Sequence, residues 1–136
     1  MIFLDSSFIV ACKIEDDENH RKAIDYLTKI IEERYENFIT SDFIFDEVVT
    51  VVFVKTKDIN AAIDAGSILR VSSIIKKIDE EVFEKSWEIF KEQRNTKLSF
   101  TDCSTIALIV KEGIKNIATF DSDFKKIKYV NVFPQN

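Results

Sequence analysis

Met1-Ile2-Phe3-Leu4-Asp5-Ser6-Ser7 opens the chain, and this stretch decides how the rest is interpreted. Its apolar run is short enough for one buried strand, which Asp5 ends. Ser6 and Ser7 precede a second apolar run, and Ser and Asp are common at helix starts because their oxygens accept hydrogen bonds from unpaired N–H groups. The pattern predicts a strand, a carboxylate and then a helix. Ligands bind at the carboxyl ends of parallel strands, so Asp5 is a candidate site residue; the alternative is that it only caps the helix.

The composition indicates one globular domain over residues 1–136. Of the 136 residues, 46% are hydrophobic and 32% are charged, which is enough apolar material for a core. No apolar run reaches the length of a membrane span and no signal peptide is visible, so a cytoplasmic protein without a membrane partner is expected. A net charge of -5 argues against a protein that coats nucleic acid through a basic surface. It leaves open an enzyme that binds nucleic acid locally.

Short apolar strands alternate with amphipathic helices along the chain. This alternation predicts an α/β fold, with a central, mainly parallel sheet of four to five strands and helices on both faces. The expected strands are the opening run, 37–40, 73–78, 116–120 and 129–132, and the expected helices run to about Cys12 and over 18–35, 41–54, 58–71, 80–93 and 99–113.

Two side-chain patterns on these helices predict where the core lies. In the helix over 58–71, Ile59, Ile63 and Leu69 are expected to face inward. The twelve phenylalanines are most simply core residues.

Two carboxylates follow predicted strands. Asp5 and Asp121 each end a short apolar run, and parallel strands end on the same side of a sheet, so both carboxylates should meet at one edge. Asp102 lies in the first turn of a predicted helix, after Ser99, in a capping-box pattern. Capping alone would also explain Asp102.

Glu47 is a fourth acidic residue in an unusual place. Its helical neighbours Phe43, Ile44 and Val51 are apolar, so its helix face is largely apolar. A buried carboxylate is costly unless it pairs with a cation or coordinates a metal. An exposed Glu on a partly apolar helix is the simpler alternative.

Four carboxylates at one sheet edge would need a cation. Two carboxylates about 4 Å apart repel by roughly 4 kcal/mol at an effective dielectric near 20. Hard oxygen ligands select Mg²⁺ or Mn²⁺, and such an ion lowers the pKa of bound water and stabilises charge on a phosphoryl group.

These residues together resemble the PIN-domain ribonucleases, and among them the VapC toxins of prokaryotic toxin–antitoxin pairs. The resemblance runs from the first predicted strand to the last, and no single motif carries it alone. The matching stretches are Asp5-Ser6-Ser7, Glu47 within Ser41-Asp42-Phe43-Ile44-Phe45-Asp46-Glu47, Thr101-Asp102, and Thr119-Phe120-Asp121-Ser122-Asp123-Phe124.

The resemblance implies a three-layer α/β/α fold and a metal-dependent endoribonuclease, in which metal-activated water attacks the RNA phosphodiester. It also implies a VapB-like antitoxin as partner and a homodimer. By position, the catalytic and metal-binding residues would be Asp5, Glu47, Asp102 and Asp121. The supporting residues would be Ser6, which is next to Asp5, together with Thr101 and Asp123.

The last motif offers two carboxylates. Asp121 is expected to follow its strand, Ile117–Phe120, immediately, so it is the expected direct or water-mediated ligand. Asp123 is then expected to be a more distant or turn-capping residue.

Other folds with an acid after the first strand fit less well. A haloacid-dehalogenase-type phosphatase needs a second acid at Ser7, and receiver domains need paired acids where Asp5 stands alone. Nucleotide-binding folds need a glycine-rich turn that the sequence lacks here. An RNA-processing nuclease or a non-catalytic interaction module with the PIN fold stays open, although four acids favour catalysis.

Overall fold

The structure is a computed structural model that describes residues 1–33 and 37–135. The last two residues of the helix predicted over 18–35 lie outside the described residues. Within them, five strands form one sheet in the order β3-β2-β1-β4-β5, and every neighbouring pair is parallel. The strands are β1 (Ile2–Leu4), β2 (Phe38–Ser41), β3 (Ile74–Lys76), β4 (Asn116–Ala118) and β5 (Asn131–Phe133).

The opening stretch of the chain forms the central strand. All three residues of β1 are buried, as expected for a strand covered on both faces. From β1 the chain adds β2 and β3 on one side, and later β4 and β5 on the other. Strand order therefore reverses between β1 and β4, which is where open α/β sheets bind ligands.

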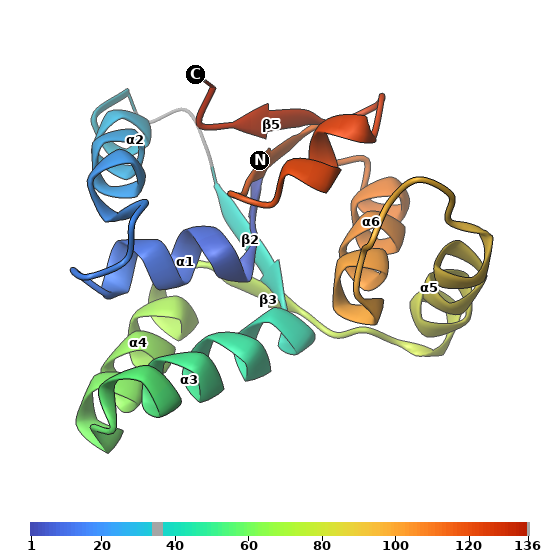
Figure 1. Cartoon of the computed structure of the whole chain (residues 1–136). Coiled ribbons are helices and arrows are strands. Elements are labelled where there is room, and N and C mark those ends of the chain that lie inside the picture. The colour runs from blue at the N-terminus through green and yellow to red at the C-terminus, as the bar shows by residue number, and fades with distance from the viewer. Residues whose placement is uncertain (34–36, 136) are drawn as a thin grey trace.

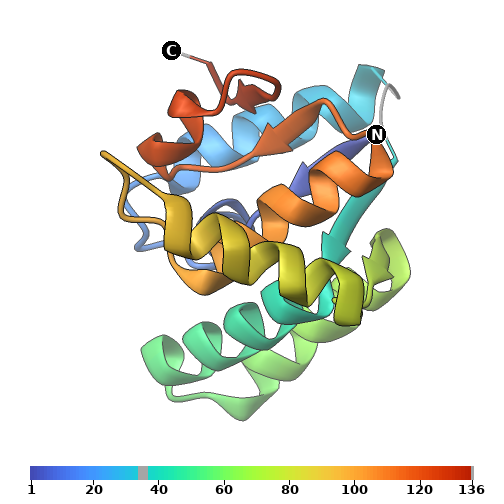
Figure 2. The ribbon, with the colours of Figure 1, turned by 90° about the vertical axis from the view of Figure 1, so that its right-hand side faces the viewer.

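Helices cover both faces of the sheet (Figure 1). One layer contains α1, α2 and the α3–α4 pair, and the other contains α5 and α6, which lie in front of the sheet in Figure 2. The predicted three-layer α/β/α fold is confirmed. The helix bounds are α1 (Ser6–Lys13), α2 (His20–Glu33), α3 (Asp42–Thr56), α4 (Ile59–Ser72), α5 (Glu80–Glu92), α6 (Phe100–Glu112) and the 3₁₀-helix η1 (Ser122–Lys126). Within the described ranges, no helix is both long and apolar enough to cross a bilayer.

The predicted inward face of α4 is wrong for two of its three residues. Leu69 is buried at 4% exposure, but Ile59 and Ile63 are 52% and 57% exposed. Helix α4 packs on α3 through small residues instead: a Cβ at Gly66 would lie 3.0 Å from Cγ1 of Val49. The neighbouring isoleucine stripe consequently lines an open groove between α3 and α4.

The phenylalanines divide between the core and the surface. Phe3, Phe8 and Phe124 are fully buried, as predicted. Phe83 and Phe90 on α5 are 45% and 38% exposed, so the assignment of all phenylalanines to the core is wrong. Helix α5 is amphipathic, and its buried positions are Val82 and Ser86.

Candidate active site

Asp5 is buried at the carboxyl end of the central strand. Its side chain is 2% exposed, and its backbone N–H donates to the carbonyl of Ala118, at the end of β4, over 3.0 Å. Asp5 occupies the N-cap position of α1, yet its side chain makes no capping hydrogen bond. The alternative that Asp5 only caps this helix is therefore wrong.

Two hydroxyl groups hold the Asp5 carboxylate. Oδ2 accepts hydrogen bonds from Thr119 Oγ1 at 2.6 Å and from Ser7 Oγ at 3.0 Å. The Ser7 hydroxyl also accepts from the N–H of Phe120 at 2.9 Å, and Thr119 Oγ1 accepts from the N–H of Asp121 at 3.0 Å. These contacts tie the end of β1 to the segment that follows β4.

Ser7 and Thr119 were not predicted as site residues. Both lie inside the motifs quoted above, but only their positions next to strand ends could have indicated this role. The predicted supporting residue Ser6 hydrogen-bonds through its side chain to Glu47. The hydroxyl that supports Asp5 from α1 belongs to Ser7.

Glu47 lies half-buried in the middle of α3 and points toward the start of α6. Burial and the nearby Asp102 carboxylate raise its pKa, while hydrogen bonds from Thr101 and Ser6 lower it. The predicted supporting residue Thr101 thus contacts Glu47. Helices α1, α3 and α6 therefore meet at this carboxylate.

Asp102 caps the start of α6 and also lies near other carboxylates. The backbone N–H of Ser99 donates to Asp102 Oδ2 at 3.0 Å, and the N–H of Asp102 donates to Ser99 Oγ at 3.0 Å, so the predicted capping box is present. Burial raises the pKa of Asp102, and the carboxylates of Asp121 and Asp123 raise it further. Capping occupies one carboxylate oxygen and leaves the carboxylate near its acidic neighbours.

Asp121 and Asp123 belong to η1 and its cap. The strand ends at Ala118, so the prediction that Asp121 immediately follows the strand is wrong. The ladder stops there because β4 pairs with Leu4 and Phe133 at Ala118, and both partner strands end at those residues. Asp121 caps η1 by accepting from the N–H of Asp123 at 2.9 Å.

The Asp123 carboxylate is engaged elsewhere. Oδ1 lies 3.0 Å from Lys126 Nζ, and Oδ2 accepts from the N–H of Lys97 at 3.1 Å. These contacts lower the pKa of Asp123. Both oxygens of Asp123 therefore have partners within the chain, whereas Asp121 uses Oδ1 for its cap.

Asp5, Glu47, Asp102 and Asp121, which we call the acidic cluster, carry negative charge that no described cation neutralises. Burial raises the pKa of Asp5 to about 6, against hydrogen bonds from Thr119 and Ser7 that lower it, and the Asp102 carboxylate adds to the rise. Between described residues, no salt bridge involves Asp5, Glu47, Asp102 or Asp121. Asp5 Oδ1 is buried and has no hydrogen-bond partner among the described residues.

The cluster is open rather than a closed metal cage. Over 1–33 and 37–135, no group of three or more His, Cys, Asp or Glu side chains is arranged so that it could by itself hold a metal ion. Asp102 nevertheless acts electrostatically on Asp5 and Glu47, and Asp121 acts on Asp102. The arrangement can attract a cation, with water supplying the remaining ligands.

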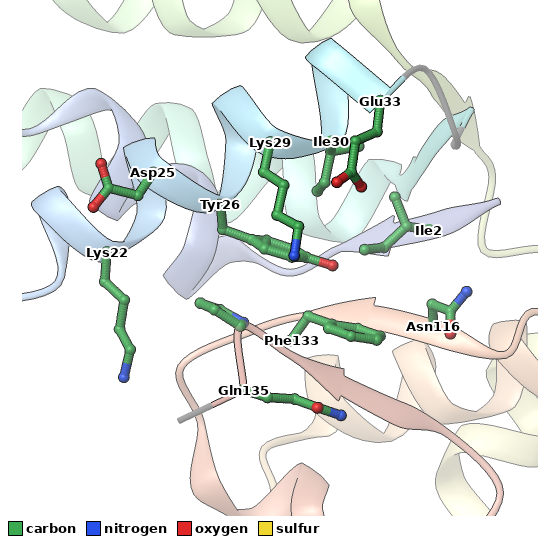
Figure 3. Close-up of a pocket in the computed structure, with 11 residues that line it drawn as sticks. Ile2, Lys22, Asp25, Tyr26, Lys29, Ile30, Glu33, Asn116, Phe133 and Gln135 are labelled. Atoms are coloured by element: carbon green, nitrogen blue, oxygen red, sulfur yellow. The ribbon is translucent and has the colours of Figure 1, made fainter.

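A separate cavity lies at the other end of the sheet (Figure 3). It has a volume of about 470 Å³ and is lined in part by Ile2 and Asn116, the first residues of β1 and β4. Tyr26 of α2 and Phe133 of β5 stack in it at 5.5 Å between ring centroids. None of the predicted site residues is among the described residues that line this cavity.

Comparison with known proteins identifies the family. The chain matches the PIN domain over residues 2–129. It belongs to the PIN domain family.

Relatives and solved structures agree with this assignment. The 23S rRNA-specific endonuclease VapC20 of Mycobacterium tuberculosis is 26% identical over 137 residues, which cover 99% of this chain and 100% of that protein. The crystal structure of VapC20, a sarcin-ricin loop cleaving toxin, superposes with a TM-score of 0.85 at 25% identity, covering 98% of this chain and 100% of VapC20. VapBC2 from Rickettsia felis, bound to a DNA fragment from its promoter, has a TM-score of 0.70 at 16% identity with full coverage of both chains, and supports the fold alone.

The predicted family and the predicted enzyme class, an endonuclease, are confirmed.

Proposed function

We propose that this chain is a Mg²⁺- or Mn²⁺-dependent endoribonuclease and the VapC-like toxin of a toxin–antitoxin pair. One observation carries the proposal: Asp5 is buried with one oxygen lacking a hydrogen-bond partner, among carboxylates that no described salt bridge neutralises. A cation would satisfy both the unpaired oxygen and the repulsion.

The donor set fits a hard divalent ion. The residues that would hold it are Asp5, Glu47, Asp102 and Asp121, all oxygen donors, of which one or two would bind the ion directly and the others through water. Mg²⁺ usually keeps several waters and takes only one or two carboxylates, which suits an open cluster. When bound, the ion would activate water toward a phosphodiester and stabilise charge on the phosphoryl oxygens.

The surrounding residues position these carboxylates. Thr119 and Ser7 fix the Asp5 carboxylate, so its unpaired oxygen is held in place before any ion binds. Thr101 and Ser6 do the same for Glu47. Such supporting contacts orient metal ligands and tune their affinity.

The proposed substrate comes from the relatives, and the proposed partners come from the resemblance of the sequence. VapC20 is named as a 23S rRNA-specific endonuclease and as a sarcin-ricin loop cleaving toxin. By this likeness we propose an RNA substrate. From the resemblance of the sequence to the VapC toxins we also propose a VapB-like antitoxin, a homodimer and action in the cytoplasm. We also propose that residues 1–136 form a single PIN domain.

RNA cleavage tests the proposal directly. The wild-type protein should cut single-stranded RNA in Mg²⁺ or Mn²⁺ and lose this activity in EDTA, and Asp5→Asn should be inactive in both. Glu88→Gln, an exposed charge change on α5, is the matched control and should remain active. Full activity in EDTA would overturn the metal-dependent mechanism.

Mapping the 5′ ends of RNA from cells that express the protein would separate the toxin from a processing enzyme. Cuts at one site that stop growth support a toxin. Maturation ends without growth arrest would support an RNA-processing nuclease instead.

A further inference from the structure

An exposed aromatic surface, which we call the aromatic platform, lies beside the acidic cluster. It consists of Phe43, Phe83, Trp87, Phe90 and Phe100. The Phe100 ring is 5.1 Å from Phe83, 6.3 Å from Phe90 and 6.5 Å from Phe43, between centroids. Trp87 stacks on Phe90 at 5.9 Å with 13° between the ring planes. The rings are therefore continuous from the start of α3 to the outer face of α5.

The platform reaches the acidic cluster at Glu47. Phe43 lies one helical turn before Glu47 on the same face of α3, and Phe100 precedes Thr101, whose side chain hydrogen-bonds to Glu47. The rings that the platform presents outward are exposed: Trp87 is 46%, Phe83 45% and Phe90 38% exposed. An apolar surface of aromatic rings thus extends outward from the proposed reaction site.

Charge makes this surface more suitable for bases than for phosphates. Helix α5, which carries three of the five rings, has five glutamates and two lysines, so its charge does not attract the phosphates of a polyanion. Aromatic rings hold single strands in another way, because every base has a face that can stack on them. Lys91 Nζ, 5.5 Å from the centre of the Trp87 ring, adds a cation at the edge of the platform.

We propose that the aromatic platform binds unpaired nucleobases next to the scissile phosphate, with Trp87 as the outermost stacking ring. The inference rests on the proposed ribonuclease function. It names the substrate feature that the enzyme recognises: an unstacked base in a loop or single strand, since bases inside a duplex offer no free face. Trp87, Phe83 and Phe90 are binding residues and not catalytic residues.

Trp87 is the only tryptophan of the chain, so its fluorescence reports on the platform alone. Asp5→Asn protein in Mg²⁺, which should not cut RNA, is titrated with a single-stranded RNA hexamer and with an abasic hexamer of the same phosphate backbone. The base-containing RNA should quench Trp87 and the abasic RNA should not. Equal quenching by both, or quenching by neither, would overturn the proposal.

Kinetics with loop RNA provide the second readout. Stacking on one aromatic side chain accounts for roughly a 5- to 150-fold change in affinity, so Trp87→Ala should raise KM by that factor with kcat nearly unchanged. Trp87→Phe should restore most of the affinity. Val71→Ala, at a position 87% exposed on α4, is the control and should leave KM unchanged. An unchanged KM in Trp87→Ala would contradict the proposal.

A second copy of the chain is the competing occupant. Sedimentation of wild type and Trp87→Ala distinguishes the two: an unchanged oligomeric state supports base stacking, and conversion of a dimer to a monomer shows that the surface joins two copies. If wild-type protein cuts no RNA with either metal, the ribonuclease function fails. The fluorescence titration still tests the platform, because it requires no cleavage.

Discussion

Asp5 stores unfavourable charge in the folded protein. It is 2% exposed, one of its oxygens has no hydrogen-bond partner in the part of the chain that the structure describes, and the nearby Asp102 carboxylate repels it. Burial disfavours the ionised carboxylate, and this raises its pKa from 3.8 to about 6. Sites built for function commonly carry such a cost in stability.

The pH dependence of stability should reveal this cost. Between pH 4 and 6 the native state keeps a proton that the unfolded state releases, so the free energy of unfolding falls as the pH rises. A shift from 3.8 to about 6 corresponds to on the order of 3 kcal/mol by pH 7. Metal-free Asp5→Asn should therefore melt at or above the wild-type temperature at pH 7, with the difference shrinking toward pH 4.

Thermal melts in EDTA, monitored by circular dichroism, check this prediction. The amide oxygen of Asn can still accept the hydrogen bonds of Thr119 and Ser7, so packing should be preserved. A much lower melting temperature for Asp5→Asn at pH 7 would make Asp5 a structural residue.

The last motif gives a second prediction about individual residues. Asp121→Asn should lose more RNA cleavage at limiting Mg²⁺ than Asp123→Asn. Asp123 already contacts Lys126 and the N–H of Lys97, so its loss should mainly weaken the turn. Loss of such a supporting residue typically lowers activity or metal affinity by about 10–100-fold. Cleavage rates over a Mg²⁺ titration provide the measurement, and a larger loss in Asp123→Asn would reverse the two roles.

At the scale of elements, the start of α6 couples helix stability to the site. The Ser99 hydroxyl accepts from the N–H of Asp102, and the Asp102 carboxylate accepts from the N–H of Ser99. Loss of an N-cap side chain typically costs about 1 kcal/mol. The same contact also orients a carboxylate of the proposed site.

Two cap substitutions should therefore separate stability from activity. Ser99→Ala and Asp58→Ala should each lower the free energy of unfolding by about 1 kcal/mol, because Asp58 caps α4 through the N–H of Asn60. Only Ser99→Ala should also reduce RNA cleavage, since α4 contributes no proposed ligand. Urea unfolding and cleavage assays on the same preparations test this. Equal activity in both variants would show that the capping box does not orient Asp102.

Strong local patterns explain how much of this fold was predictable. The buried run Ile2–Leu4 and the Ser99–Asp102 capping box each follow from adjacent residues, and both are present. The pairing of Thr119 with Asp5 spans 114 residues, so no local pattern indicates it.

Packing partners explain the errors. Ile63 has helical spacing suited to a core, but α4 meets α3 through Gly66 and leaves Ile63 in the open groove. The exposed aromatic rings of α5 have the same explanation. Apolar periodicity predicts that a helix has an apolar face, but it does not predict whether another element covers that face.

For the whole molecule, the topology of the sheet brings acidic residues that are far apart in the sequence to one edge of the sheet. The reversal of strand order at β1 brings the end of β1, the segment after β4 and the starts of α1 and α6 to one edge. Residues separated by most of the chain then repel one another in a protein already at net charge -5. Folding without a cation should consequently leave the protein less stable than folding with one.

Divalent metal should therefore stabilise the folded protein before any RNA is present. A ligand that binds only the native state adds about 2.7 kcal/mol at 100 times its Kd. Mg²⁺ or Mn²⁺ should raise the melting temperature of wild type above that in NaCl of equal ionic strength, because bulk screening alone cannot satisfy the unpaired oxygen of Asp5. Asp5→Asn should lose most of this rise, and Glu88→Gln, which removes one exposed charge from α5, should keep it. Equal metal-induced shifts in wild type and Asp5→Asn would place the ion elsewhere on the molecule.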